Sequence, residues 1–173
     1  MKTCDLSHYS LLWRSRPPWH GKKSRARLLD AVVYGNKGIM LDTGHLMNAN
    51  PALTSQAQGA AWIGEMLDAH GPLCRYIRGV HLHQSLSGPY VRAQTGTLPA
   101  LPKDYLERFS ISYGHILRID THSPWTDPSV RALVERIGPE FLVHELSAPN
   151  RAARARALAL QTRALGFPSP SGG

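Results

Sequence analysis

The hydrophobic pattern of this chain is dominated by four short apolar runs. Acidic or imidazole side chains lie at the end of each run or directly after it. The runs span residues 38–41, 79–83, 115–120 and 141–145. A continuous apolar run between turn-forming residues predicts a strand covered on both faces, as in parallel sheets. Apolar residues at helical spacing predict helices over residues 54–70, 102–109, 128–137 and 149–165. The alternation indicates an α/β fold of four successive β/α units.

The remaining segments surround this pattern. Residues 1–27 have no hydrophobic period and predict an irregular basic leader, although residues 25–33 predict a short helix. Residues 84–101 are rich in Gly, Ser, Thr and Pro and predict a long excursion above the strand ends, of the kind that forms binding sites or lids. We therefore expect a leader (1–27), one domain (28–166) and a flexible tail (167–173).

Composition places the chain in the class of folded globular proteins. Its 173 residues are 42% hydrophobic and 18% charged, which suits one domain with a sizeable core. An apolar run of about 18 residues, the length that a membrane-spanning helix needs, is lacking, and the polar N-terminus does not resemble a secretory signal. Cys4 and Cys74 have neither metal nor redox spacing. We expect a cytoplasmic protein without a membrane partner.

The formal charge of +8 is concentrated in the leader. Residues 1–28 contain seven Lys or Arg and one acid, while the other 145 residues contain thirteen bases and eleven acids. A basic arm can bind phosphate backbones, but a solvated terminus is the simpler interpretation and the one we favour. Because the domain itself is close to neutral, we do not expect nucleic acid to be its partner.

The chemistry at the strand ends is the main functional signal. Residues two apart in a strand share a face, so His81 and His83 lie together in the second strand, and Asp120 and His122 at the end of the third. In a parallel sheet the carboxyl ends of all strands meet at one edge. Asp42, His81, Asp120 and Glu145 are therefore predicted to converge there, where α/β folds bind their ligands.

Imidazoles and carboxylates in one polar cavity suit a divalent ion such as Zn²⁺ or Mn²⁺. Such an ion polarises a sugar carbonyl or hydroxyl, or lowers the pKa of a bound water, while Glu145 moves a proton. Each residue has a plainer explanation when taken alone: Asp42 could close an Asx turn, a histidine could be a hydrogen-bonded core residue, and Glu145 could pair with Arg151 or Arg118. Four strand ends carrying the same chemistry favour a site.

These motifs resemble the second half of the xylose isomerase-like (β/α)₈ barrel family, which includes sugar phosphate isomerases/epimerases and endonuclease IV-type enzymes. The matching pieces, in family order, are LDTGHL at 41–46, GVHLH at 79–83, IDTH at 119–122 and FLVHE at 141–145. The resemblance covers about residues 28–166. It implies a partial (β/α)₈ TIM barrel in which the four units correspond to strands 5–8.

The resemblance also implies roles for individual residues. The implied metal ligands are Asp42, His81, Asp120, His122 and Glu145. Glu145 would also be the proton-transferring base, and His45 a second catalytic residue. His83 competes with His81 as the ligand from the second strand, with His81 preferred, and the implied substrate-binding residues are His83 and Arg118. The implied cofactor is one divalent metal, with Zn²⁺, Mn²⁺, Mg²⁺ and Co²⁺ left open.

The family pattern is incomplete in this chain. Its first three strands have no counterpart, and residues 9–13, where the fourth would lie, lack the expected metal-binding glutamate. We therefore expect a truncated member with an incomplete site, whose metal need not be retained, and either a homodimer or a complementing chain to cover the sheet edges. The implied function is a metal-dependent sugar (phosphate) isomerase or epimerase. The alternatives are an endonuclease IV-like abasic-site phosphodiesterase and a non-catalytic fragment with part of a metal site.

Overall fold

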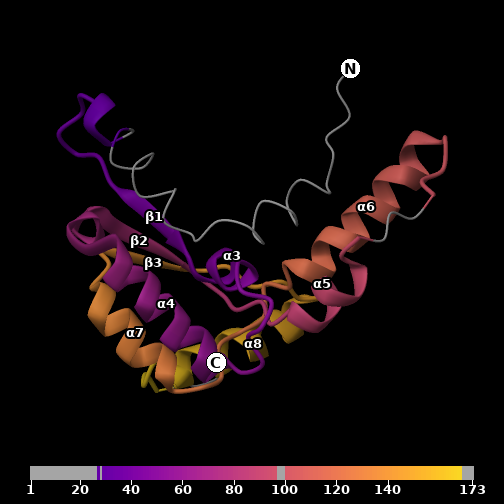
Figure 1. The fold of residues 1–173 in the computed structure, drawn as a ribbon. Coiled ribbons are helices and arrows are strands. Elements are labelled where there is room, and N and C mark those ends of the chain that lie inside the picture. The colour runs from indigo at the N-terminus through magenta and orange to yellow at the C-terminus, as the bar shows by residue number, and fades with distance from the viewer. Residues whose placement is uncertain (1–26, 28, 97–99, 169–173) are drawn as a thin grey trace.

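Three parallel strands form the sheet in the part of the chain that the structure, a computed structural model, describes: residues 27, 29–96 and 100–168 (Figure 1). The strands are β1 (Ile39–Asp42), β2 (Ile77–Leu82) and β3 (Phe141–His144), in the order β1-β2-β3. Asp42 pairs with His81, and Leu82 with His144. Because the strands run in one direction, their carboxyl ends lie together at one edge, which we call the rim.

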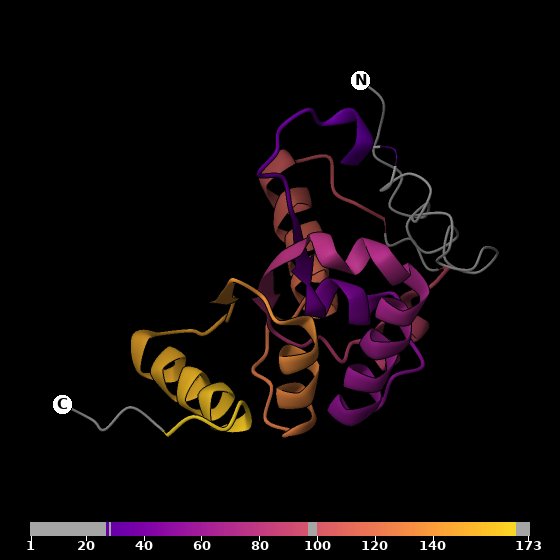
Figure 2. The same cartoon turned by 90° about the vertical axis from the view of Figure 1, so that its left-hand side faces the viewer.

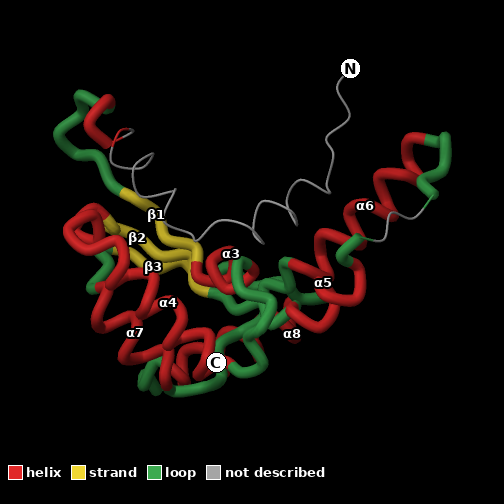
Figure 3. The backbone as a smooth tube through the Cα atoms, in the orientation of Figure 1, coloured by secondary structure: helices red, strands yellow, loops and turns green. Residues whose placement is uncertain are grey.

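Helices connect and cover the strands (Figure 3). They are α3 (Thr43–Asn48), α4 (Gln56–His70), the 3₁₀ helix η1 (Gly71–Tyr76), α5 (Gly88–Gln94), α6 (Tyr105–Ile119), α7 (Ser129–Ile137) and α8 (Arg151–Ala164). Side-chain caps begin α4 and α8. The Ser55 hydroxyl accepts from the Gln58 backbone N–H, and the side-chain amide oxygen of Asn150 accepts from the Ala153 backbone N–H. The predicted helices over residues 54–70, 128–137 and 149–165 are confirmed.

The described helices pack on one face of the sheet, and Phe141 and Val143 of β3 are exposed on the other face. Val80 and Leu82 of β2 are fully buried in a core with Ile63, Trp125 and Val130, and burying side chains of this size stabilises the fold by roughly 1.5–3 kcal/mol each. In Figure 1, α4 and α7 lie below the sheet. Since side chains alternate along a strand, Asp42 and His81, which are paired in register, project to the face opposite the described helices.

The predicted third strand is wrong. Residues 115–119 form the end of α6, and Asp120 is its C-cap. The Asp104 carboxylate starts this helix by accepting from the Glu107 N–H at 2.9 Å. Apolar side chains then recur at helical spacing up to Leu117, so an apolar run that looks like a strand in a short window is the last turn and a half of a longer helix.

The expected partial (β/α)₈ barrel of four β/α units is therefore wrong as well, because the described residues form a sheet of three strands. The broader expectation of an α/β fold with a parallel sheet is confirmed. The excursion over residues 84–101 contains α5, and the helix predicted for 102–109 begins at Tyr105 and continues to Ile119.

The structure describes few residues at either end of the chain. The predicted leader lies outside the described residues except for Arg27, and the predicted tail lies outside them except for residues 167 and 168. Of the helix predicted over 25–33, residues 29–31 are helical. Over the described ranges, each helix is too short or too polar to cross a membrane.

Candidate metal centre

Asp42 and His45 are placed at the rim by the junction of β1 and α3. Asp42 is the last residue of β1 and the N-cap of α3, and its Oδ1 accepts from the His45 N–H at 2.9 Å. This cap holds the His45 imidazole between two carboxylates. Its Nδ1 lies 3.2 Å from Asp42 Oδ2, and its Nε2 lies 2.7 Å from Asp120 Oδ2. One imidazole thus joins an acid from β1 to an acid from the end of α6.

His83 follows β2 and is fully buried. Its Nε2 lies 2.9 Å from Asp42 Oδ1. Gly44 leaves space for the ring, because a Cβ at residue 44 would lie 2.0 Å from Cε1 of His83. The Thr43 hydroxyl donates to the His83 carbonyl at 2.6 Å, and the Trp125 indole N–H donates to the same carbonyl at 2.9 Å. The backbone and the ring of His83 are therefore both fixed.

Asp120 and His122 arrive from the end of α6. Gln84 and Ser123 form an antiparallel bridge that ties this loop to the chain beyond β2, and the Ser85 hydroxyl donates to Asp120 Oδ1 at 3.2 Å. His122 has a φ of 45°, a left-handed conformation that costs a non-glycine residue on the order of 1 kcal/mol. Its ring stacks on His83 with centroids 4.1 Å apart. The loop therefore holds a strained histidine against a buried one.

Glu145 follows β3 and closes the cluster. Its Oε2 lies 3.0 Å from His81 Nδ1 and 3.8 Å from His83 Nε2, and its Oε1 lies 3.7 Å from His122 Nε2. Its backbone N–H donates to the Leu82 carbonyl at 3.3 Å, which extends the pairing of β2 and β3 by one residue. Three histidines thus surround one carboxylate.

Two overlapping groups of these residues could hold a metal ion. One consists of His45, His83, Asp120 and His122, and the other of Asp42, His83 and Glu145. Within each group the candidate ligand atoms lie within 4.8 Å of one another. His83 belongs to both groups, and four nitrogen and oxygen donors are the number that zinc takes in most proteins. We call these two sets the donor groups.

Two buried atoms in the donor groups have no hydrogen-bond partner among the described residues: Nδ1 of His83 and Oε2 of Glu145. Oε2 of Glu145 lies within ion-pair distance of His81 but makes no hydrogen bond to it. An unpaired buried polar atom costs about 1–3 kcal/mol. A cation would satisfy a lone pair on either atom, so the residues present fit a bound metal.

The electrostatics of the cluster favour the ionised form of Asp42 at neutral pH. Burial raises the pKa of Asp42, but the hydrogen bond from His83, the His45 N–H and the charges of both imidazoles outweigh it and lower the pKa from 3.8 to about 2. Burial lowers the pKa of His45, but its hydrogen bond to Asp120 and the charges of the nearby carboxylates raise it above its ordinary value. The rim therefore attracts a positive charge.

The structure brings most of the predicted site residues together. The donor groups include the predicted ligands Asp42, Asp120, His122 and Glu145, together with His45 and His83, which were expected to serve catalysis and substrate binding. The preferred ligand His81 belongs to neither group, although its Nδ1 lies 3.0 Å from Glu145. Arg118 also belongs to neither group, and its guanidinium lies 5.5 Å from the centroid of the Tyr90 ring.

A buried amide on α8 supports the cluster from behind. Gln161 Nε2 donates to the Leu82 carbonyl at 2.9 Å and lies 2.8 Å from His144 Nδ1, while its Oε1 accepts from the Trp125 N–H at 2.8 Å. Burial lowers the pKa of His144, which keeps that ring neutral and able to accept. Sequence reasoning missed Gln161, whose only signal is a polar residue on the helix face that also carries Leu165.

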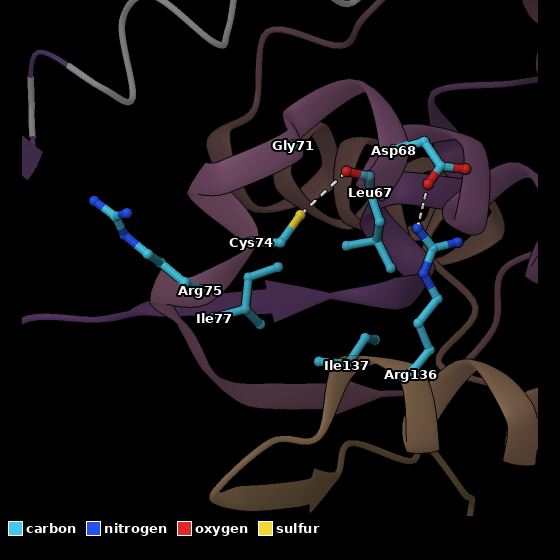
Figure 4. A pocket seen from close by; sticks show the side chains of 8 residues that line it. All are labelled: Leu67, Asp68, Gly71, Cys74, Arg75, Ile77, Arg136 and Ile137. Carbon is cyan, nitrogen blue, oxygen red and sulfur yellow. Dashed lines mark hydrogen bonds and ion pairs between the residues drawn. The ribbon is translucent and has the colours of Figure 1, made fainter.

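The described residues also form a cavity of about 420 Å³ away from this cluster (Figure 4). It lies near Ile77, the first residue of β2, and therefore at the opposite end of that strand from the rim. Its wall includes Leu67, Ile137 and the ion pair of Arg136 with Asp68, at 2.5 Å. It shares no residue with the donor groups, so the candidate site is the rim and not this cavity.

Comparison with protein-family models, with curated proteins and with solved structures finds no match for the chain. The fold and the site define an α/β protein with a histidine- and carboxylate-rich candidate metal centre at the carboxyl ends of a parallel sheet.

Proposed function

We propose that this chain binds a divalent metal ion at the rim and uses it in sugar or sugar phosphate isomerase or epimerase chemistry. The observation that supports it most directly is the pair of unsatisfied buried atoms, Nδ1 of His83 and Oε2 of Glu145, within a convergent set of imidazoles and carboxylates. Such a set suits a cation and has no comparable use in packing an apolar core.

The donor chemistry favours a borderline ion over Mg²⁺. Mg²⁺ prefers oxygen ligands and keeps several waters, whereas imidazole nitrogen suits Zn²⁺, and three of the four residues in the larger donor group are histidines. That group alone supplies four donors, so a tetrahedral ion would not require the further glutamate of the family pattern, which residues 9–13 lack. Zn²⁺ is therefore our first candidate, followed by Mn²⁺ and Co²⁺.

A bound divalent ion would supply Lewis-acid polarisation of a substrate carbonyl or hydroxyl. The protein would supply the proton transfer. The Glu145 side chain is 38% exposed and the His45 side chain 57% exposed, so both can be reached by a small polar substrate at the rim. Glu145 is a carboxylate surrounded by histidines, which suits a general base acting on a carbon-bound or hydroxyl proton. The resemblance to sugar isomerases supports the choice of substrate class.

Metal content tests the binding part of this proposal. Purified full-length chain is loaded with Zn²⁺, Mn²⁺ or Co²⁺, desalted, and measured by inductively coupled plasma mass spectrometry. We expect at least one equivalent of metal in the wild-type chain and its loss in His83→Ala. His115→Ala is the control, because His115 contacts Tyr90 on α5 and belongs to neither donor group. A metal-free wild-type chain, or equal loss in both variants, would contradict the proposal.

Proton exchange tests the catalytic part. Aldose and ketose phosphates and their free sugars are incubated in D₂O with the metal-loaded chain, and deuterium at the carbon next to the carbonyl is followed by NMR. We expect exchange with at least one substrate and its loss in Glu145→Gln. Stoichiometric metal without exchange on any substrate would leave the non-catalytic metal-binding alternative and reject the isomerase.

The overlap of the donor groups at His83 supports a second candidate, an abasic-site phosphodiesterase. Two groups that share one histidine could hold more than one ion, and paired ions suit in-line phosphoryl displacement. The nearly neutral charge of residues 29–173 argues against a duplex substrate. Incubating the zinc-loaded chain with an abasic-site oligonucleotide decides between the two candidates, since cleavage would support the phosphodiesterase and an intact strand would reject it.

A further inference from the structure

The helix α6 exposes an apolar face that the rest of the described chain does not cover. In Figure 1 it projects with α5 from the right-hand side of the molecule, the side that faces away from the viewer in Figure 2. Within its 15 residues not one side chain is buried. Six large apolar side chains are each 44–72% exposed: Tyr105, Leu106, Phe109, Tyr113, Ile116 and Leu117. We call these six the α6 stripe.

The α6 stripe occupies one side of the helix. At 3.6 residues per turn its members fall within about a third of the circumference, and the rings of Tyr105, Phe109 and Tyr113 stack successively at 6.4 and 5.6 Å. The other side of α6 faces α5, because His115 and Arg118 contact Tyr90 there. The stripe therefore points away from α5.

The stripe is large enough to require a partner. Six side chains of this size and exposure present about 700 Å² of surface, which exceeds the largest apolar patch of a typical monomer. It also approaches the roughly 800 Å² that each partner contributes to a standard protein interface. The stripe contains no charged residue, so a complementary partner must be apolar.

The order of residues in the stripe identifies that partner. Read from either end, the stripe is symmetric about residue 111: Tyr105 corresponds to Leu117, Leu106 to Ile116, and Phe109 to Tyr113. An antiparallel copy of α6 would therefore place Phe109 against Tyr113 at the centre and Leu106 against Ile116 on either side, with Tyr105 against Leu117 at the ends. A two-fold dimer needs this kind of self-complementary patch. We propose that α6 is the contact helix of a homodimer and pairs antiparallel with α6 of a second copy.

Oligomeric state tests this proposal with a matched pair of variants. Phe109 lies at the centre of the stripe, whereas Ile111, which is 46% exposed, lies on the other side of the helix. Sedimentation equilibrium of the full chain at about 100 µM is expected to give a dimer, with Kd raised at least tenfold in Phe109→Glu and unchanged in Ile111→Glu. A wild-type monomer, or equal effects of both substitutions, would overturn the proposal. Circular dichroism confirms that each variant is folded.

Cross-linking tests the direction of the pairing. Residues 106 and 116 are about 15 Å apart along one helix, too far for a disulfide within a chain. In a chain whose Cys4 and Cys74 are replaced by Ser, we expect L106C/I116C to form a covalent dimer under mild oxidation and L106C alone to remain uncross-linked. Cross-linking of L106C alone indicates parallel helices, and an uncross-linked double variant indicates that the stripes do not meet. Either result would overturn the antiparallel pairing.

Discussion

The His83 ring lies directly against Gly44, in space that a side chain at residue 44 would fill. A Cβ at residue 44 would lie 2.0 Å from the His83 ring, so the imidazole occupies the volume that any other residue would fill. Gly44 is also the second residue of α3, in the first turn after the Asp42 cap. The shape of α3 and the position of the central histidine therefore depend on each other.

We predict that Gly44→Ala displaces His83 and weakens metal binding at least tenfold, because His83 belongs to both donor groups. It should also destabilise the fold by about 1–3 kcal/mol, the usual cost of overpacking a dense site. Gly114→Ala is the control, since a Cβ there meets nothing within 4 Å and alanine favours a helix interior by about 0.5–1 kcal/mol. Zinc titration and urea unfolding measure both effects. Equal metal affinity in the two variants would refute the role of Gly44.

The two histidines of the GVHLH segment should differ in importance. We predict that His83→Ala abolishes stoichiometric metal binding, whereas His81→Ala lowers affinity only modestly, because His81 contacts Glu145 and Asp42 without belonging to either donor group. Isothermal titration with Zn²⁺ ranks the two variants. The reverse order of affinities would show that the ligand from β2 is His81.

At residue 122, substitution by glycine should leave the chain more stable than substitution by alanine. Its φ of 45° suits glycine and strains other residues. We expect His122→Gly to be more stable than His122→Ala by about 1 kcal/mol in the metal-free chain, the opposite of the order in a helix. Both variants lose a donor and should bind metal more weakly. Chemical unfolding curves in the presence of a chelator make the comparison, and a more stable alanine variant would contradict the strained backbone.

Gln161 should contribute to stability far more than its position in an alanine- and arginine-rich helix suggests. Gln161→Leu would leave the Trp125 backbone N–H without its partner, at about 1–3 kcal/mol, and would remove one of the two donors to the Leu82 carbonyl. The neighbouring side chain of Leu160 is exposed, so Leu160→Ala is expected to cost less than about 1 kcal/mol. Thermal unfolding distinguishes them. Equal melting temperatures would show that the amide network contributes nothing.

Asp42 should make the stability of the metal-free chain fall with pH in the acidic range. Its folded pKa of about 2 lies below the unfolded value, so its stabilisation is complete above pH about 4 and disappears as the pH falls through about 2. The shift corresponds to about 2 kcal/mol. We expect the stability difference between wild type and Asp42→Asn to shrink by about that amount from pH 5 to pH 2. A difference independent of pH would contradict the lowered pKa.

The sequence predicts where the candidate ligands lie better than it predicts the number of strands. Asp42 ends β1 and Glu145 directly follows β3, so the parallel-sheet argument placed both at the rim correctly. Asp120 reaches the same place from the C-cap of a helix, because a short apolar run carries too little information to separate a strand from the end of α6. The strand count, and with it the partial barrel, was wrong for that reason.

The choice between His81 and His83 could not be made from alternation along a strand. Both residues are predicted on one face, but β2 ends at Leu82, and His83 enters a space that exists only because residue 44 lacks a side chain. That space depends on a contact between residues far apart in sequence. The buried amide of Gln161 was missed for the same reason, since its partners lie on β2, on β3 and in the loop before α7.

Anomalous diffraction from crystals of the zinc-loaded chain, recorded on both sides of the zinc absorption edge, tests the metal centre most directly. We expect an anomalous peak within bonding distance of His83 and at least two further residues of the donor groups, at the distances of about 2.0–2.2 Å that nitrogen and oxygen ligands of zinc show. A peak elsewhere on the protein, or no peak in crystals grown from zinc-loaded chain, would contradict a metal centre at the rim.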